Sequence, residues 1–116
     1  MATQRVPNDF LNSAVGGEDL SAKTHFLVAI ESDATIELAV EGERVAGVIQ
    51  EGKAAGLSST YQHGGVAKVV TGAGVRAGQR VQSDALGRAI EGSSNAFGTA
   101  ISDVPSANML VEVQID

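Results

Sequence analysis

Residues 72–90 read Gly72-Ala-Gly-Val-Arg-Ala-Gly-Gln-Arg-Val-Gln-Ser-Asp-Ala-Leu-Gly-Arg-Ala-Ile90, and this stretch decides the fold that we expect. Two short runs with an apolar pattern, Gln79–Ser83 and Leu86–Ile90, are separated by turn residues, which predicts a β-hairpin that reverses near Asp84–Gly87. The three preceding glycines could instead suggest a phosphate-binding loop. Such a loop requires a helix after the glycines, and a strand pattern follows Gly78. The sequence therefore argues against nucleotide binding.

The same strand pattern continues through the chain after residue 23. Apolar and other side chains alternate over residues 36–40 and 109–115, as in half-buried strands. His25–Ile30 is apolar on both faces, as a central strand is, and the turn at Glu31–Ala34 predicts a second hairpin. The other expected strands are Arg44–Gln50, Val66–Thr71 and Phe97–Ser102. Together these runs predict a mainly β protein, a small single-domain barrel or sandwich of about eight short strands.

Residues 1–23 differ in kind, because glycine, proline, asparagine and serine interrupt every short apolar pair. We expect a loose N-terminal arm over residues 1–23 and a β domain over residues 24–116. Two interpretations of the arm remain open: a disordered terminus, or an extended segment that becomes ordered on a neighbouring subunit. Phe10 and Leu11 are the one large apolar pair in the arm.

The composition suggests that the protein associates with itself. The 116 residues include three Phe, one Tyr, no Trp and no Cys, so the core must be built mainly from aliphatic side chains without disulfides. A small aliphatic core gains stability when copies associate. The N-terminus has no apolar stretch typical of a secretion signal, and no apolar run approaches the roughly 20 residues that cross a bilayer. We expect a soluble protein that is not exported and has no membrane partner.

The net charge of −6 argues against a nucleic-acid partner, because binding to phosphates requires clustered lysine and arginine. Acidic residues gather in one segment around a single base, Arg44. They are Glu31, Asp33, Glu37, Glu41, Glu43 and Glu51. This segment is interpreted either as a solvated face or as a surface for a basic partner.

No catalytic, cofactor or metal site is expected. His25 and His63 are the only histidines and have no ligand-spaced partner for zinc. The acids around Asp33 lack the ligand order of an EF-hand calcium loop. A hydrolase that uses Ser59 and His63 would also need an orienting acid and an oxyanion hole, which the sequence does not supply.

A second class of function is a small β-barrel carrier or ligand-binding module. A lipoyl or biotinyl carrier requires a lysine at a hairpin tip within a characteristic tripeptide. Lys53 in Gly-Lys-Ala and Lys68 in Ala-Lys-Val do not fit that pattern.

From Arg44 onward the chain resembles the head decoration, or capsid cement, proteins of tailed bacteriophages. The resemblance covers about residues 24–116 and lies in the order and spacing of short motifs. They are Arg44-Val-Ala-Gly-Val-Ile49, Glu51-Gly-Lys-Ala-Ala-Gly56, Gly65-Val-Ala-Lys-Val69, Val75-Arg-Ala-Gly-Gln-Arg-Val81, Ser83-Asp-Ala-Leu-Gly-Arg-Ala89, Phe97-Gly-Thr-Ala100 and Leu110-Val-Glu-Val113.

The resemblance implies a mainly β homotrimer with no enzymatic activity and no cofactor. It implies that the protein is made in the host cytoplasm and ends on the outer capsid surface of the virion. There it would bind the major capsid protein at threefold or quasi-threefold positions and clamp the lattice. The family motif fixes no contact residues. The candidates from this sequence are Phe10 and Leu11 in the arm, and Tyr61 in a glycine-flanked loop, because rigid aromatic and large apolar side chains anchor interfaces.

Overall fold

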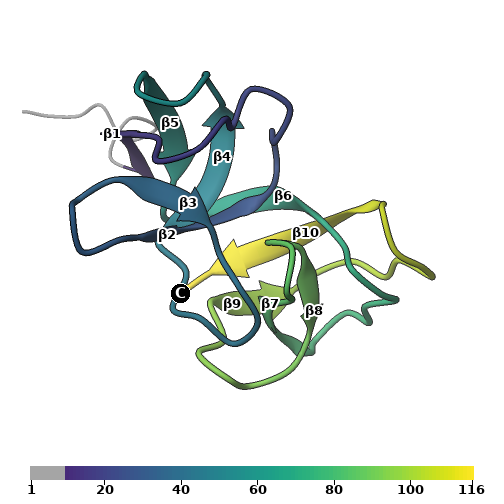
Figure 1. The fold of residues 1–116 in the computed structure, drawn as a ribbon. Coiled ribbons are helices and arrows are strands. Elements are labelled where there is room, and N and C mark those ends of the chain that lie inside the picture. The colour runs from purple at the N-terminus through teal and green to yellow at the C-terminus, as the bar shows by residue number, and fades with distance from the viewer. Residues whose placement is uncertain (1–9) are drawn as a thin grey trace, which may run out of the picture.

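The computed structural model describes residues 10–116 as ten β-strands in two antiparallel five-stranded sheets (Figure 1). The first sheet has the order β1-β5-β4-β2-β3, with β1 at Leu11–Val15, β5 at Ser58–Gln62, β4 at Gly47–Glu51, β2 at Leu27–Ile30 and β3 at Ile36–Leu38. The second has the order β6-β10-β9-β7-β8, with β6 at Val66–Val70, β10 at Leu110–Ile115, β9 at Gly98–Ala100, β7 at Arg80–Ser83 and β8 at Ala89–Glu91. The predicted mainly β class is confirmed, in the form of a sandwich-like arrangement. In residues 10–116 no helix is long and apolar enough to cross a membrane.

Both predicted hairpins are present. Strands β7 and β8 pair in antiparallel register, with Ser83 opposite Ala89, and the chain reverses through the loop that begins at Asp84. Strands β2 and β3 pair in the same way, with Ile30 opposite Ile36. The glycine-rich stretch after β6 leads into strand β7 and not into a helix, so it has no helix N-terminus to hold a phosphate.

Two strands were not predicted from the sequence, and they pair with each other. Strand β1 lies antiparallel to β5, with Leu11 opposite Gln62 and Val15 opposite Ser58. The arm expected over residues 1–23 thus contributes β1 to the first sheet, and it also contributes the fully buried Leu20 to the core. Residues 1–9 lie outside the described part of the chain.

The two sheets have the same connectivity, so the chain is an internal structural repeat. If the strands of the second sheet are renumbered from its first strand, its order 6-10-9-7-8 becomes 1-5-4-2-3, the order of the first sheet. In each sheet a parallel bridge also joins the residue after the first strand to the start of the third. These bridges are Gly16 to Ile36 and Thr71 to Ala89. We call residues 10–64 the N-half and residues 65–116 the C-half.

The repeat extends to individual backbone hydrogen bonds and turns. Phe26 O accepts from Ile49 N at 2.9 Å, and Gln79 O accepts from Ala100 N at 2.9 Å. Residues with positive φ also fall at matching places in the two halves. The matching pairs are His25 and Gly78, Ala34 and Gly87, Gly42 and Asn95, and Gly56 and Asn108.

The core lies in two clusters that follow the alternation of strand β2. Val28 points into the N-half, where it joins a cluster with Leu20 and Tyr61. Leu27 and Ala29, on the opposite face of β2, belong to a larger cluster with the C-half. That cluster is mainly aliphatic, as the composition predicts, with Phe97 as its one aromatic member. The C-half therefore covers the face of the N-half sheet on which Leu27 and Ala29 lie.

Candidate functional site

Of the predicted contact residues, Leu11 is the first residue of strand β1 and Phe10 directly precedes it; both are about two-fifths exposed. The Phe10 ring lies directly over Gly64, where no Cβ could be accommodated, and Phe10 O accepts from His63 N at 2.8 Å. Phe10 also lines a shallow hollow together with Val66, which is 51% exposed. Phe10 and Val66 therefore present exposed apolar side chains to the same hollow.

Tyr61 lies elsewhere in the structure than the sequence suggested. It belongs to strand β5 and not to a loop, and only 5% of its surface is exposed. Its ring packs in the N-half core, while its hydroxyl accepts from Asn12 Nδ2 at 3.3 Å. The structure therefore leaves Tyr61 little surface to offer a partner.

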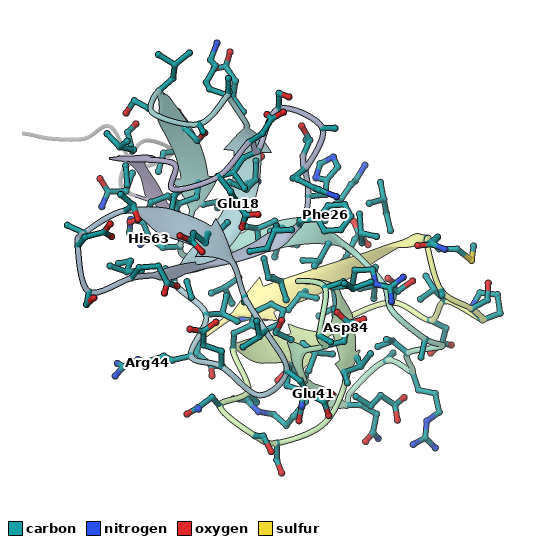
Figure 2. The ribbon with its side chains drawn as sticks, viewed as in Figure 1. Glu18, Phe26, Glu41, Arg44, His63 and Asp84 are labelled. Carbon is teal, nitrogen blue, oxygen red and sulfur yellow. The ribbon has the colours of Figure 1, made fainter. Side chains whose placement is uncertain are left out.

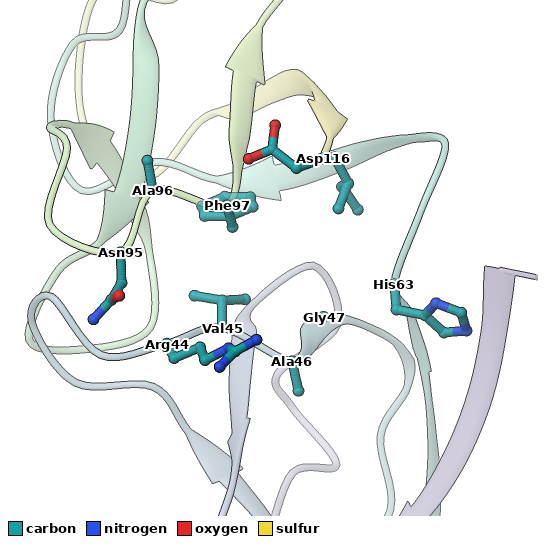
Figure 3. A pocket seen from close by; sticks show the side chains of 10 residues that line it. Arg44, Val45, Ala46, Gly47, His63, Asn95, Ala96, Phe97 and Asp116 are labelled. Carbon is teal, nitrogen blue, oxygen red and sulfur yellow. The ribbon is translucent and has the colours of Figure 1, made fainter.

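A second concave feature near these residues is an open hollow between the two halves. Segment 44–47 of the N-half faces segment 95–97 of the C-half across it, and His63 lies at one side (Figure 3). Val45 of the N-half and Phe97 of the C-half line it from opposite sides (Figure 3). Arg44 also lines it and projects away from the ribbon (Figure 2). The hollow holds about 420 Å³, and its lining also includes the polar side chains of Arg44, His63, Asn95 and Asp116. It is open to solvent and therefore lacks the enclosed, mainly apolar character of most small-molecule sites.

One ion pair lies beside this hollow. Arg80 donates to Asp116 Oδ1 at 2.8 Å and to Thr99 Oγ1 at 3.1 Å. The hydrogen bond from Arg80 lowers the pKa of the Asp116 carboxyl, and the same bond raises the pKa of Arg80. Both groups remain half-exposed, so solvent screens the pair.

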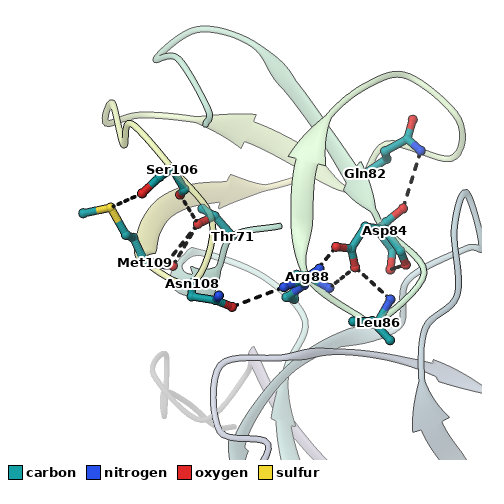
Figure 4. Close-up of polar contacts among 9 residues, drawn as sticks. Thr71, Gln82, Asp84, Leu86, Arg88, Ser106, Asn108 and Met109 are labelled. Carbon is teal, nitrogen blue, oxygen red and sulfur yellow. Dashed lines mark hydrogen bonds and ion pairs between the residues drawn. The ribbon is translucent and has the colours of Figure 1, made fainter. Parts of the chain in front are cut away.

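The most buried ionic group supports a turn. The Asp84 side chain accepts from Leu86 N at 2.9 Å and Arg88 N at 2.8 Å through Oδ1, and from Arg88 Nε at 2.9 Å through Oδ2 (Figure 4). Arg88 in turn donates to Asn108 Oδ1 at 3.2 Å, which joins the β7–β8 loop to the segment before β10. All of these hydrogen bonds join groups of the β7–β8 loop to one another or to the segment before β10. Asp84 therefore has a structural role.

The catalytic interpretation of Ser59 and His63 finds no support in the geometry. Ser59 is fully buried, and its Oγ accepts from Lys53 N at 2.9 Å, whereas His63 is exposed. No hydrogen bond joins the two among residues 10–116, and that part of the chain contains no cluster of three or more side chains able to hold a metal ion. Lys53, considered as a carrier lysine, pairs with Glu51 at 3.1 Å.

The acidic segment is concentrated around the β2–β3 hairpin. Partial desolvation first, and then repulsion from Glu43, Glu37, Asp33 and Glu18, raise the pKa of Glu31. Asp33 is the exception, because its hydrogen bonds from Thr35 lower its pKa. The N-half therefore has an acidic end, as the sequence predicts.

Comparisons with known proteins give a fold and no sequence family. No protein-family model matches the chain, and neither does any curated protein sequence. Among solved structures, the chain is similar to the head fiber gp8.5 N base of bacteriophage phi29, with a TM-score of 0.72. The similarity covers 91% of this chain and 92% of that one at 18% sequence identity. The two proteins therefore share a fold over nearly their whole lengths.

Proposed function

We propose that this chain is a structural protein of a tailed-phage head, which binds the outer capsid surface as a homotrimer at threefold or quasi-threefold positions and stabilises the major-capsid lattice. The observation that carries the proposal is the shared fold with the base of the phi29 head fiber over 91% of this chain. The decoration-protein motifs from Arg44 onward, found independently of that comparison, lead to the same class of protein.

The chemistry of the described residues is compatible with a binding role. Two buried polar side chains, Ser59 and Asp84, accept hydrogen bonds from backbone N–H groups of the chain itself. The hollow between the halves is shallow and open. A cement protein needs a rigid scaffold that presents surfaces to several subunits, and linked copies convert weak contacts into strong binding through effective concentration.

The proposed capsid contact is the apolar surface of Phe10, Leu11 and Val66. All three side chains are large, apolar and between 39% and 51% exposed. Leu11 lies in β1, Val66 lies in β6, and Phe10 O accepts a hydrogen bond from His63 N, so little backbone entropy is lost when these residues are covered. Tyr61 is left out of the proposed contact because the core already buries it.

The experiment is co-sedimentation of purified protein with expanded heads that lack it. The wild-type chain should bind at saturable stoichiometry and delay the loss of heads on heating. A Phe10→Ala/Leu11→Ala double variant should bind more weakly. Leu57→Ala, which truncates an equally apolar side chain that is 55% exposed elsewhere, is the matched control.

Absence of binding by the wild-type chain to the heads of its own phage would refute the proposed function. Binding that leaves the heat resistance of the heads unchanged would refute the stabilising role alone. Equal binding by the double variant and the Leu57→Ala control would exclude the proposed contact surface.

A further inference from the structure

The contact between the two halves runs head to tail. Three backbone hydrogen bonds cross between them: Val70 N to His25 O at 3.0 Å, Leu27 N to Gly87 O at 2.8 Å, and Gly42 N to Ser83 O at 3.1 Å. If the halves were related by a twofold axis, each bond would have a mate with the roles of the halves exchanged. No such mates occur among the backbone hydrogen bonds of residues 10–116. Each half therefore uses a different surface in this contact.

The internal repeat identifies the two surfaces that this contact leaves unused. On the N-half, the positions equivalent to the contact residues of the C-half are Val15, Ile30 and Ala34. On the C-half, the positions equivalent to the contact residues of the N-half are Gly78, Arg80 and Asn95. The equivalences follow from matching strand ends, bridges and positive φ angles. We call these sets the N-half surface and the C-half surface.

The N-half surface is apolar and open. Ile30 is 60% exposed and Val15 is 44% exposed. Beside Ile30 lies a groove of about 190 Å³, lined also by Val45 and Ala46 and by the charged residues Glu43 and Arg44. In the C-half, Ser83 occupies the position equivalent to Ile30; it is fully buried, and its carbonyl accepts a hydrogen bond from Gly42 N of the N-half. Ile30 is thus exposed in the N-half at a position that is buried in the C-half, which indicates that the N-half surface lacks a partner.

The backbone at this surface is also available for pairing. Gly16 N donates to Leu57 O at 3.0 Å, so the N–H of the preceding residue, Val15, points away from β5, to the side of β1 on which Gly16 bridges to Ile36. The equivalent group in the C-half is Val70 N, which donates to His25 O across the halves. A second copy would offer Gly78 O in the place of His25 O.

Charge favours the same pairing. The N-half surface adjoins the β2–β3 loop, which carries Glu31 and Asp33. On the C-half surface, Arg80 stands where Leu27 stands in the N-half, and its side chain remains 45% exposed beside Asp116. Repetition of the intrachain contact between copies would bring Arg80 of one copy to the acidic loop of the next. Opposite charges then meet across the interface.

We propose that the partner of the N-half surface is a second copy of this chain, which docks its C-half surface there and repeats between chains the contact that joins the halves within a chain. Because the contact is head to tail, copies associate in sequence and close into a ring when the rotation permits. The surface follows from the repeat, whereas a ring of three copies rests on the proposed function.

The experiment uses three single variants and sedimentation velocity. Ile30→Glu places a charge in the groove of the N-half surface. Thr99→Glu blocks the C-half surface, because Thr99 lies opposite Arg80 at the position equivalent to the buried Val48. Leu57→Glu alters an equally exposed side chain outside both surfaces. Thermal unfolding of each variant checks its fold.

The wild-type chain and Leu57→Glu should associate equally, and each blocking variant should associate at least about tenfold more weakly, because an unpaired charge is costly to bury. A mixture of Ile30→Glu and Thr99→Glu should form dimers of one chain of each, since each supplies the surface that the other lacks. Should either blocking variant misfold, an Ile30→Cys chain mixed with an Asn95→Cys chain should form a mixed disulfide, as the native sequence has no cysteine.

A wild-type chain that stays monomeric at high concentration, or blocking variants that assemble normally, would overturn the proposal. Assembly of the blocking variants together with normal binding to heads would leave the proposed function in place. A mixture that stays monomeric, although the wild-type chain assembles, would also overturn it.

Discussion

Ala34 and Gly87 occupy the same position in two equivalent hairpin loops, and both have a left-handed backbone, with φ of 70° and 74°. The flanking bonds are also the same: Glu31 N donates to Thr35 O and Asp84 N to Arg88 O, both at 2.8 Å. A left-handed conformation costs a residue with a Cβ roughly 1–2 kcal/mol, and glycine avoids that cost. The N-half therefore contains strain that its repeat does not.

Ala34→Gly should raise the free energy of unfolding by about 0.5–1 kcal/mol, since the relief of strain exceeds the entropy that glycine adds to the unfolded chain. Gly87→Ala should lower it by more than about 1 kcal/mol, because its Cβ would also lie 2.9 Å from Leu27 O. Urea denaturation measures both. Ala85→Gly, in a loop position without positive φ, is the control and should be slightly destabilising. A destabilising Ala34→Gly would contradict the assignment of strain.

Gly47 and Gly98 form a second equivalent pair, each required by a close approach of backbone. A Cβ on Gly47 would overlap Gln62 O, and a Cβ on Gly98 would overlap Gln114 O. Alanine at either position should cost about 1–3 kcal/mol, because the opposing strand must move. Gly78→Ala is the comparison, since its Cβ meets open space and only the φ of 85° opposes it, at a cost of about 1 kcal/mol. Equal losses at all three glycines in denaturant unfolding would exclude the steric explanation.

The sequence predicts the strands that have one apolar face and misses the pair that does not. Strand β5 reads Ser-Ser-Thr-Tyr-Gln, so it has no run of alternating aliphatic residues, and β1 is exposed along most of its length. Their pairing depends on tertiary context, which also places Tyr61 in a strand and buries it. Local sequence patterns cannot predict a pairing between two segments that lie so far apart in the sequence.

The internal repeat cannot be recognised from the sequence, for a related reason. Equivalent positions carry different side chains, such as Tyr61 and Val113, or Ile36 and Ala89. The two halves bury different partners, so their residues diverge while the backbone connectivity stays the same. The sequence points to Phe10 and Leu11 as contact residues because they are large apolar residues in a polar segment. It gives no such signal for Ile30, which resembles the core residues of its own strand.

Asp84 should be the most sensitive ionic position. It is only 9% exposed and satisfies two backbone N–H groups and the Arg88 side chain. Asp84→Ala should cost about 2–4 kcal/mol in denaturant unfolding, because the buried donors lose their acceptor. Arg88→Ala leaves the carboxylate with its backbone donors and should cost less. A larger loss for Arg88→Ala would show that the ion pair, and not the turn, determines the stability.

The Arg76–Glu91 pair predicts a pH dependence. Hydrogen bonds from the Arg76 side chain, and then from its backbone N–H, lower the pKa of Glu91. A lowered folded-state pKa contributes stability above the ordinary carboxyl pKa near 4, and that contribution is lost as the pH falls through the folded-state value. Glu91→Gln should therefore be less stable than the wild-type chain at neutral pH and equal to it near about pH 2.

Glu31→Gln is the matched opposite, because the raised pKa of Glu31 makes its charge unfavourable in the folded state. This variant should gain stability at neutral pH and lose that advantage in acid. Thermal unfolding over a pH series measures both variants. Parallel curves for both variants and the wild-type chain would contradict the two assignments.

Leu20 tests whether the segment before residue 24 belongs to the folded domain. Its side chain is fully buried in the N-half core, and its backbone N–H donates to Lys53 O at 2.9 Å. Leu20→Ala should cost about 3–5 kcal/mol through lost burial and the cavity left behind. Leu57→Ala, at 55% exposure, should change stability by less than about 0.5 kcal/mol. Deletion of residues 1–20, which removes β1 as well, should abolish cooperative unfolding of the N-half. An unchanged melting temperature for Leu20→Ala would show that this segment does not support the core.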